Sequence, residues 1–176
     1  MGRSPGLLRE PIRVLRVPDP LPRAYAVTGI RVADGWGAYQ ALLDPSFDPR
    51  HEVVLANGPA RAAAPLSARV RILERRPDRL RIQARVDAPA TIVVTEAFDP
   101  GWRAWVDGRS TPVWRANVAF RAIPVPAGDS TIVLAYRPRS VRLGSAVGAG
   151  ALLGTLWLLL RSPRRTTAGP AVTNPP

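Results

Sequence analysis

Three acidic residues, Glu96, Asp99 and Asp107, are the carboxylates nearest to the tryptophans of this chain. Two carboxylates that flank a sugar about 5–9.5 Å apart can hydrolyse a glycosidic bond. Asp99 precedes Pro-Gly, however, and Asp107 precedes Gly, and both are ordinary turn positions. The pattern favours turns over catalysis, so we assign no catalytic residue and expect a chain that is not itself an enzyme.

The chain has few residues of the types that bind a metal ion or form a catalytic triad. The chain has no cysteine, and its one histidine is His51. Zinc sites and Ser-His-Asp triads need more of these residues than the chain has. We therefore predict no metal site and no cofactor, and we expect His51 to be an exposed residue at the start of a strand.

The charge is strongly basic. The sequence has a net charge of +12, and all of its basic side chains are arginine. Such a chain attracts polyanions, such as anionic lipid headgroups or phosphate-bearing envelope glycans. Nucleic acid is disfavoured, because neither a recognition element nor an aromatic RNA-binding motif is present. Five arginines fall on one face of two consecutive predicted strands, either solvated or facing an anionic partner: Arg69, Arg71, Arg79, Arg81 and Arg85.

Tryptophans offer a second binding hypothesis. Trp105 and Trp114 are expected on the face opposite Trp102, where they could stack against sugar rings while Arg103 and Arg115 supply hydrogen-bond donors. The alternative is that both rings pack beneath a loop or beneath the segment 21–57. The sequence leaves both interpretations open.

The elements that would position these residues are mostly strands. Residues 68–74 and 79–87 alternate polar and apolar, which indicates half-buried strands. Asp107-Gly108 predicts a two-residue hairpin turn that pairs Val106 with Arg109. Further strands are predicted at 91–98, 102–106, 109–114, 119–125 and 131–136. The expected fold is mainly β: an antiparallel β-sandwich with a small α+β N-terminal lead-in and one C-terminal transmembrane helix.

The transmembrane assignment depends on the uncharged run Leu143–Leu160, whose length approaches that of a bilayer core. Upstream, a helix from Trp36 to Leu43 has apolar spacing typical of a packed face. The predicted boundaries are a flexible segment 1–20, the lead-in 21–57, a linker 58–66, the sandwich 67–138, the transmembrane helix 143–160 and a disordered tail 161–176.

The run from Val93 to Gly148 resembles the C-terminal end of the bacterial YfhO-like membrane proteins. It contains a PGW turn, a W-V-D-G hairpin, an A-N-x-x-F-R segment, a P-A-G turn and a Y-x-P before the last helix. The upstream segments LPRAYAV and DPSFDPRHEVVL are similar to the region that precedes this domain, so the resemblance covers residues 19 to about 160. The matching positions are turn and core types: Pro100, Gly101, Trp102, Asp107, Gly108, Asn117, Phe120, Gly128 and Tyr136.

The resemblance implies a relationship to GT-C glycosyltransferases, which use lipid-linked sugars at the outer side of the membrane, but it transfers no catalytic residue. We therefore expect an accessory or remnant domain of a YfhO-like glycosyltransferase. Its expected partners are the lipid bilayer and a polytopic catalytic subunit.

A stand-alone anchored module for anionic glycans or headgroups, and a tail-anchored cytoplasmic protein, remain alternatives. The expected location is the bacterial cytoplasmic membrane, with one C-terminal span and the β domain outside. Because the N-terminus lacks an apolar run of signal-peptide length, upstream helices or a partner would have to deliver the domain.

Overall fold

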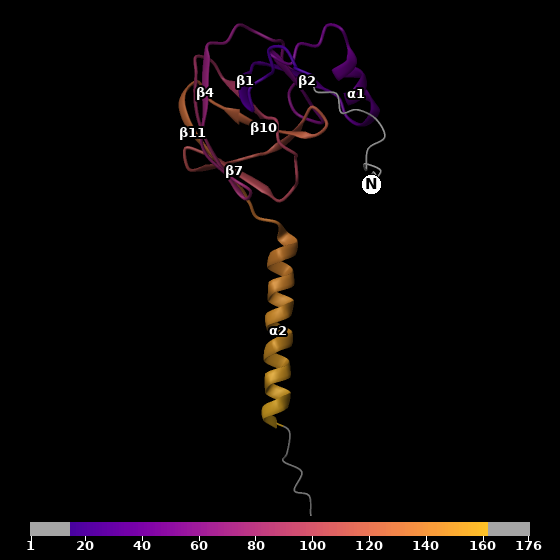
Figure 1. The fold of residues 1–176 in the computed structure, drawn as a ribbon, viewed down its shortest axis with the longest axis vertical. Coiled ribbons are helices and arrows are strands. Elements are labelled where there is room, and N and C mark those ends of the chain that lie inside the picture. The colour runs from indigo at the N-terminus through magenta and orange to yellow at the C-terminus, as the bar shows by residue number, and fades with distance from the viewer. Residues whose placement is uncertain (1–14, 162–176) are drawn as a thin grey trace, which may run out of the picture.

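A computed structural model describes residues 15–161 of the chain. It is mainly β, with two sheets and a small helix, from which a second helix projects (Figure 1). The prediction of two mostly antiparallel sheets is thus confirmed. The elements are β1 (Ala24–Val27), β2 (Gly29–Val32), α1 (Gly35–Leu43), β3 (Glu52–Leu55), β4 (Ala68–Arg76), β5 (Arg79–Val86), β6 (Ala90–Val94), β7 (Trp102–Val106), β8 (Arg109–Thr111), β9 (Trp114–Ala116), β10 (Phe120–Val125), β11 (Gly128–Tyr136) and α2 (Arg139–Arg161).

The five-stranded sheet has the order β4-β5-β11-β7-β8, and every pair in it is antiparallel. Along β5, buried apolar residues alternate with exposed polar residues, which are arginines and one glutamine, as the sequence predicts. The buried side chains, among them Ile82, Ile132 and Leu134, face the second sheet and form the main core with Ile92 and Ile123. The opposite face of this sheet is therefore exposed, and it carries the polar side chains.

The six-stranded sheet has the order β1-β6-β10-β9-β3-β2, in which only β2 and β3 run parallel. Every residue of β6 is buried, because the second face of this sheet is covered as well. Tyr25, Val53 and Leu55 belong to this second apolar cluster, against which Trp114 and Phe120 pack. Such continuous burial explains why Ile92, Val93 and Val94 are consecutive apolar residues rather than alternating ones, and why Thr91 is buried as well.

The segment 21–57 contributes β1, β2, β3 and α1 to the six-stranded sheet and its edge. Arg61, inside the segment predicted as a linker, exchanges backbone hydrogen bonds with Ile30 at 3.0 and 2.8 Å. The lead-in and the sandwich therefore share one sheet. The flexible segment predicted at 1–20 and the tail predicted at 161–176 fall largely outside the described residues.

The hairpin turn at Asp107-Gly108 is present as predicted. Both residues have positive φ, 49° and 79°, and the register pairs Val106 with Arg109 and Ala104 with Thr111. The strand predicted at 109–114 is wrong in its second half, because β8 ends at Thr111 and the chain then crosses to the other sheet as β9. Pro112 explains the break, since proline cannot donate a ladder hydrogen bond.

The membrane-span prediction needs correction. Residues 143–160 do lie in a helix, α2, which projects away from the sheets (Figure 1). Within the part of the chain that the structure describes, however, no helix combines the length and the apolarity that a bilayer crossing requires. The prediction counted the absence of charge and gave too little weight to four glycines, at positions 144, 148, 150 and 154, which bury little apolar surface.

Candidate functional site

Three residues of the family-like motifs, Trp102, Arg121 and Tyr136, lie together close to the start of α2. The guanidinium carbon of Arg121 lies 4.0 Å from the centre of the Trp102 ring, and Trp102 in turn contacts Tyr136, with ring centres 5.4 Å apart. Arg121 is only 3% exposed. Burial lowers the pKa of Arg121 from its ordinary value, although Glu96 opposes this effect. The ring face of Trp102 stabilises the cation where water cannot reach it.

Glu96 forms ion pairs with three arginines, which come from β4, from β10 and from the position just before β1. Its carboxylate accepts hydrogen bonds from Arg121 Nη2 at 2.8 Å and Arg75 Nε at 2.9 Å, and Arg23 Nη1 lies 3.7 Å away. Burial acts to raise the pKa of Glu96, but the hydrogen bond from Arg75 and the charges of Arg121 and Arg75 outweigh it and hold the pKa below its usual value. Glu96 is therefore a fixed anion that ties β4 and β10 together, not a proton donor.

The other two acidic candidates also have structural partners. Asp99 Oδ1 accepts the Gly101 amide at 2.7 Å, and partial burial together with the hydrogen bond and charge of Asp99 raises the pKa of Tyr136. Asp107 Oδ1 accepts the Thr131 amide at 2.8 Å. These contacts agree with the turn interpretation of both residues.

His51 is exposed just before β3, and its Nδ1 lies 2.7 Å from Asp48 Oδ2. In the described part of the chain, no group of three or more acidic or histidine side chains is placed to hold a metal ion.

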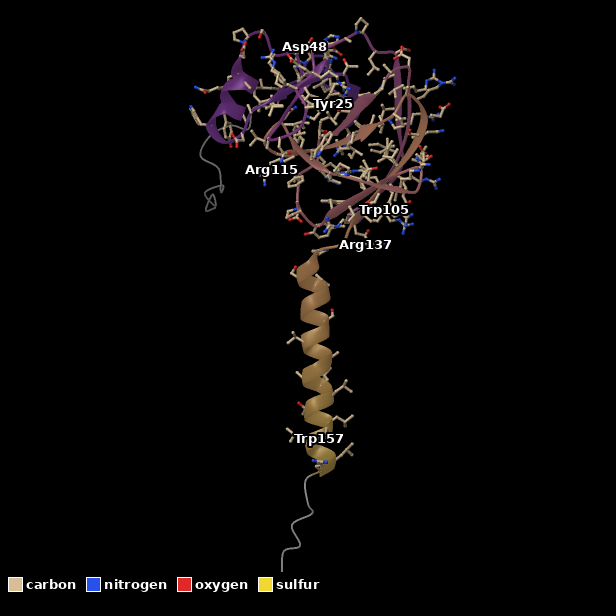
Figure 2. The ribbon with its side chains drawn as sticks, turned by 180° about the vertical axis from the view of Figure 1, so that it is seen from behind. Tyr25, Asp48, Trp105, Arg115, Arg137 and Trp157 are labelled. Carbon is tan, nitrogen blue, oxygen red and sulfur yellow. The ribbon has the colours of Figure 1, made fainter. Side chains whose placement is uncertain are left out.

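The structure separates the predicted sugar-stacking platform. Trp105 and Arg103 lie on β7 of the five-stranded sheet, whereas Trp114 and Arg115 lie on β9 of the six-stranded sheet. Arg137 covers the Trp105 ring at 5.3 Å, and Figure 2 shows this pair at the end of the sandwich from which α2 emerges. Trp114 packs against the second apolar cluster. The four residues therefore do not form one platform, because the chain changes sheets at Pro112.

The predicted arginine surface does form on the exposed side of the five-stranded sheet. Arg69 pairs directly across from Arg85, and Arg71 from Gln83. Arg79 is different, because its Nε lies 3.5 Å from Glu74. Arg85 Nε lies 3.9 Å from Asp129 Oδ2, and both side chains are largely exposed. We use the name arginine face for the four remaining residues: Arg69, Arg71, Arg81 and Arg85.

The arginine face is hollowed at one end. Ser67, Arg69, Arg85 and Asp129 line an open groove where β4, β5 and the start of β11 meet. Within the described residues, no carboxylate lies within ion-pair distance of Arg69, Arg71 or Arg81. Like charges directly opposite one another destabilise a strand pair, so this arrangement suits an anionic partner.

A second hollow was not predicted from the sequence. It lies between α1, the end of β3 and the turn that joins β9 to β10, and its polar lining residues are Asp34, Tyr39 and Arg115. The apolar spacing predicted this helix, and its two aromatic side chains are exposed, Trp36 by 74% and Tyr39 by 48%. Only Ala38 of this helix is buried. The spacing of apolar residues along a helix is the same whether they face the core or the solvent. The sequence alone could therefore not distinguish these exposed aromatic residues from core residues.

Comparison with known proteins gives one family. Residues 66–148 match the model of "Bacterial membrane protein YfhO", a range that includes the whole five-stranded sheet, strands β6, β9 and β10 of the six-stranded sheet, and the start of α2. Neither a curated protein nor a solved structure matches the chain. The match confirms the resemblance carried by the PGW, W-V-D-G and A-N-x-x-F-R motifs, whose residues form the Trp102–Arg121 cluster and the Asp107 hairpin. The match over residues 66–148 supports membership of the chain in the family of the bacterial membrane protein YfhO.

Proposed function

We propose that this chain supplies a non-catalytic β domain to a YfhO-like membrane glycosyltransferase that acts on envelope glycans from the outer side of the membrane. The family match over residues 66–148 is the observation that carries this proposal. It is supported by the structural partners of Glu96, Asp99 and Asp107, which leave these carboxylates committed to turns and ion pairs. The catalytic acid would then come from a separate membrane subunit.

Helix α2 is the element through which we propose that the domain associates with the membrane assembly. Its large apolar side chains are exposed, among them Leu152 (74%) and Leu156 (53%). An exposed apolar surface of this kind marks a site of contact with lipid or with another protein. Replacing Leu152 and Leu156 by arginine should move the chain from the membrane fraction to the supernatant. Retention of this variant in carbonate-washed membranes would contradict the role of α2.

The orientation can be tested because the chain has no cysteine of its own. Ser110 lies exposed on β8, so Ser110→Cys introduces a single reactive thiol with little change in shape. Expressed in its native gene context, this variant should react with a membrane-impermeant maleimide in intact cells as fully as in lysed cells. The cysteine-free chain is the matched control. Labelling only after lysis would overturn the outer location and with it the accessory role.

The arginine face favours a second candidate, a module that binds phosphodiester anions of envelope polymers or lipid headgroups. Four arginines on one face attract phosphates, and the attraction weakens as salt rises. Changing Arg69, Arg71, Arg81 and Arg85 to glutamine should abolish salt-sensitive binding to poly(glycerol phosphate) or to phosphatidylglycerol vesicles. The first ligand tests the polymer and the second the headgroup. Equal binding by wild type and variant to both ligands would exclude this candidate.

A further inference from the structure

We propose that the hollow beside α1 binds one pyranose ring of a glycan. This inference rests on the proposed function for the class of ligand, while the site itself follows from the geometry. The hollow has a volume of about 270 Å³, near the lower end of small-molecule pockets, which suits a single ring. Figure 2 shows that Arg115 lies on the same side of the sandwich as α1, away from Trp105 and Arg137.

The floor of the hollow is apolar and its rim is polar. Among the lining residues Ala38 and Val54 are buried and form the floor, while Asp34, Tyr39 and Arg115 are exposed and surround it. This combination of apolar surface and a few convergent polar groups is typical of ligand sites. A pyranose ring has the same division, since its axial C–H bonds form an apolar face and its hydroxyls lie around the edge.

The two charged rim residues have no competing partner. Asp34 occupies the N-cap position of α1, yet its side chain makes no capping hydrogen bond and, within the described residues, no ion pair. The guanidinium of Arg115 lies 5.1 Å from the centre of the Phe98 ring, which fixes it without using its N–H donors. A carboxylate accepts and a guanidinium donates, so together they match adjacent hydroxyls. Their charges cancel, which favours a neutral ligand over an anion.

Aromatic side chains complete the rim. The rings of Trp36 and Tyr39 lie 5.9 Å apart with an interplanar angle of 37°. Both are exposed although each could bury a large apolar area; Tyr39 lines the hollow, and Trp36 contacts Tyr39. The C–H face of a sugar ring stacked on this pair would remove the exposed aromatic surface from water.

The far side of the hollow is held in an unusual conformation. Asn117 and Val118 both have positive φ, 46° and 68°, and a β-branched residue rarely adopts this region. Asn117 Oδ1 accepts a hydrogen bond from the Val54 backbone amide at 2.9 Å, and the Asn117 backbone amide donates to the Val54 carbonyl at 2.8 Å. These bonds fix the turn that places Val118 against the floor. Strained residues that the surroundings hold in place are concentrated at binding sites.

The test is saturation-transfer NMR on the full chain in a detergent without a sugar headgroup, with methyl glucoside, methyl galactoside and N-acetylglucosamine as probes. We expect transfer to the ring protons of at least one probe. Asp34→Asn and Tyr39→Ala should each weaken this binding by about tenfold, the effect of losing roughly one hydrogen bond or stacking contact. Both side chains are exposed, so the melting temperature should stay unchanged, and this is measured alongside.

The matched controls are Arg103→Gln and Trp105→Ala, which change an arginine and an aromatic residue on the other sheet and should leave binding intact. The proposal is overturned by the absence of transfer from all three probes. It is equally overturned if transfer persists in the double variant of Asp34 and Tyr39. Because thiol labelling at Ser110 measures orientation and not sugar binding, the proposed function and this site can fail independently.

Discussion

Two groups of arginines lie on opposite sides of the five-stranded sheet and have opposite environments. Arg121 is buried, covers Trp102 and donates to Glu96 at 2.8 Å. Arg69 and Arg71 are exposed and face other polar residues without a carboxylate partner. The fold holds Arg121 through Trp102 and Glu96, although its buried Nη1 has no hydrogen-bond partner among the described residues, whereas Arg69 and Arg71 make no ion pair there. The comparison separates residues that hold the sandwich together from residues that are free to bind.

A β-bulge produces this separation within one strand. The register of β4 shifts between Ile72 and Glu74, so Glu74, rather than Leu73, continues the exposed row opposite Arg81. As a result Arg75 leaves that row and reaches Glu96, while Arg69 and Arg71 remain on the exposed side. Bulges characteristically re-aim side chains in this way.

The largest expected effect comes from breaking the buried group. Glu96→Gln removes the charge that compensates Arg121, and uncompensated buried charges are strongly destabilising. Because Glu96 retains some solvent contact and an amide can still accept one hydrogen bond, we expect a loss of about 2–4 kcal/mol in the free energy of unfolding. Denaturant unfolding of the full chain measures it. Asp129→Asn, which affects only the exposed contact with Arg85, is the matched control and should cost less than about 0.5 kcal/mol.

The same ion pairs predict how acid acts on the wild type. The pKa of Glu96 is lower in the folded than in the unfolded state, so the unfolded state takes up the proton first as the pH falls. The contribution of Glu96 is therefore complete above the ordinary pKa of 4.5 and is lost as the pH falls through the lower folded value. Glu96→Gln should have a smaller acid-induced loss of stability than the wild type. Parallel pH profiles would show that the carboxylate is not held as an ion pair.

A smaller effect is expected where Gly101 approaches Tyr136. A Cβ at position 101 would lie 2.7 Å from Tyr136 Cε2 and 2.9 Å from Asp99 Oδ1. Gly101→Ala should therefore cost about 1–3 kcal/mol through overpacking and should separate the Trp102–Tyr136 rings. In α1, a Cβ at position 37 would make only an ordinary contact with Ala33 Cβ at 3.9 Å, so Gly37→Ala should instead stabilise the chain by about 0.5–1 kcal/mol. Equal melting temperatures for the two variants would contradict the close contact at Gly101.

The hairpin gives the next effect in size. Gly108 has φ of 79° and its Cβ position is open, so Gly108→Val should cost more than about 1 kcal/mol through backbone strain alone. Asp107→Asn keeps the side-chain oxygen that accepts the Thr131 amide and should be nearly neutral. Thermal unfolding of both variants tests the turn. A Gly108→Val variant as stable as Asp107→Asn would rule out the assigned conformation.

These cases show which structural features could be predicted from the sequence. The Asp107 hairpin and the alternation of β5 depend on local backbone chemistry, and both were predicted correctly. The strand predicted at 68–74 was too short, since β4 continues to Arg76 through a bulge that no local signal marks. The transfer of β9 to the other sheet and the exposure of Trp36 depend on contacts between distant segments. The hollow beside α1 could not be foreseen for the same reason, because β3, α1 and the Asn117 turn meet only in the folded chain.

The smallest effect tests the exposed group directly, and it has the opposite sign. Arg69 faces Arg85 across β4 and β5, and two like charges in this position repel each other. Arg69→Gln should therefore raise the free energy of unfolding by about 0.2–0.5 kcal/mol at low salt, and the gain should shrink as salt screens the repulsion. Arg79→Gln is the matched control, because Arg79 lies near Glu74 and its removal should give no such gain. If Arg69→Gln instead destabilises the chain, Arg69 has a structural partner and the arginine face is part of the scaffold. If it stabilises the chain while weakening phosphate binding, the fold retains this charge at a cost to its own stability, as expected of a surface that serves a partner.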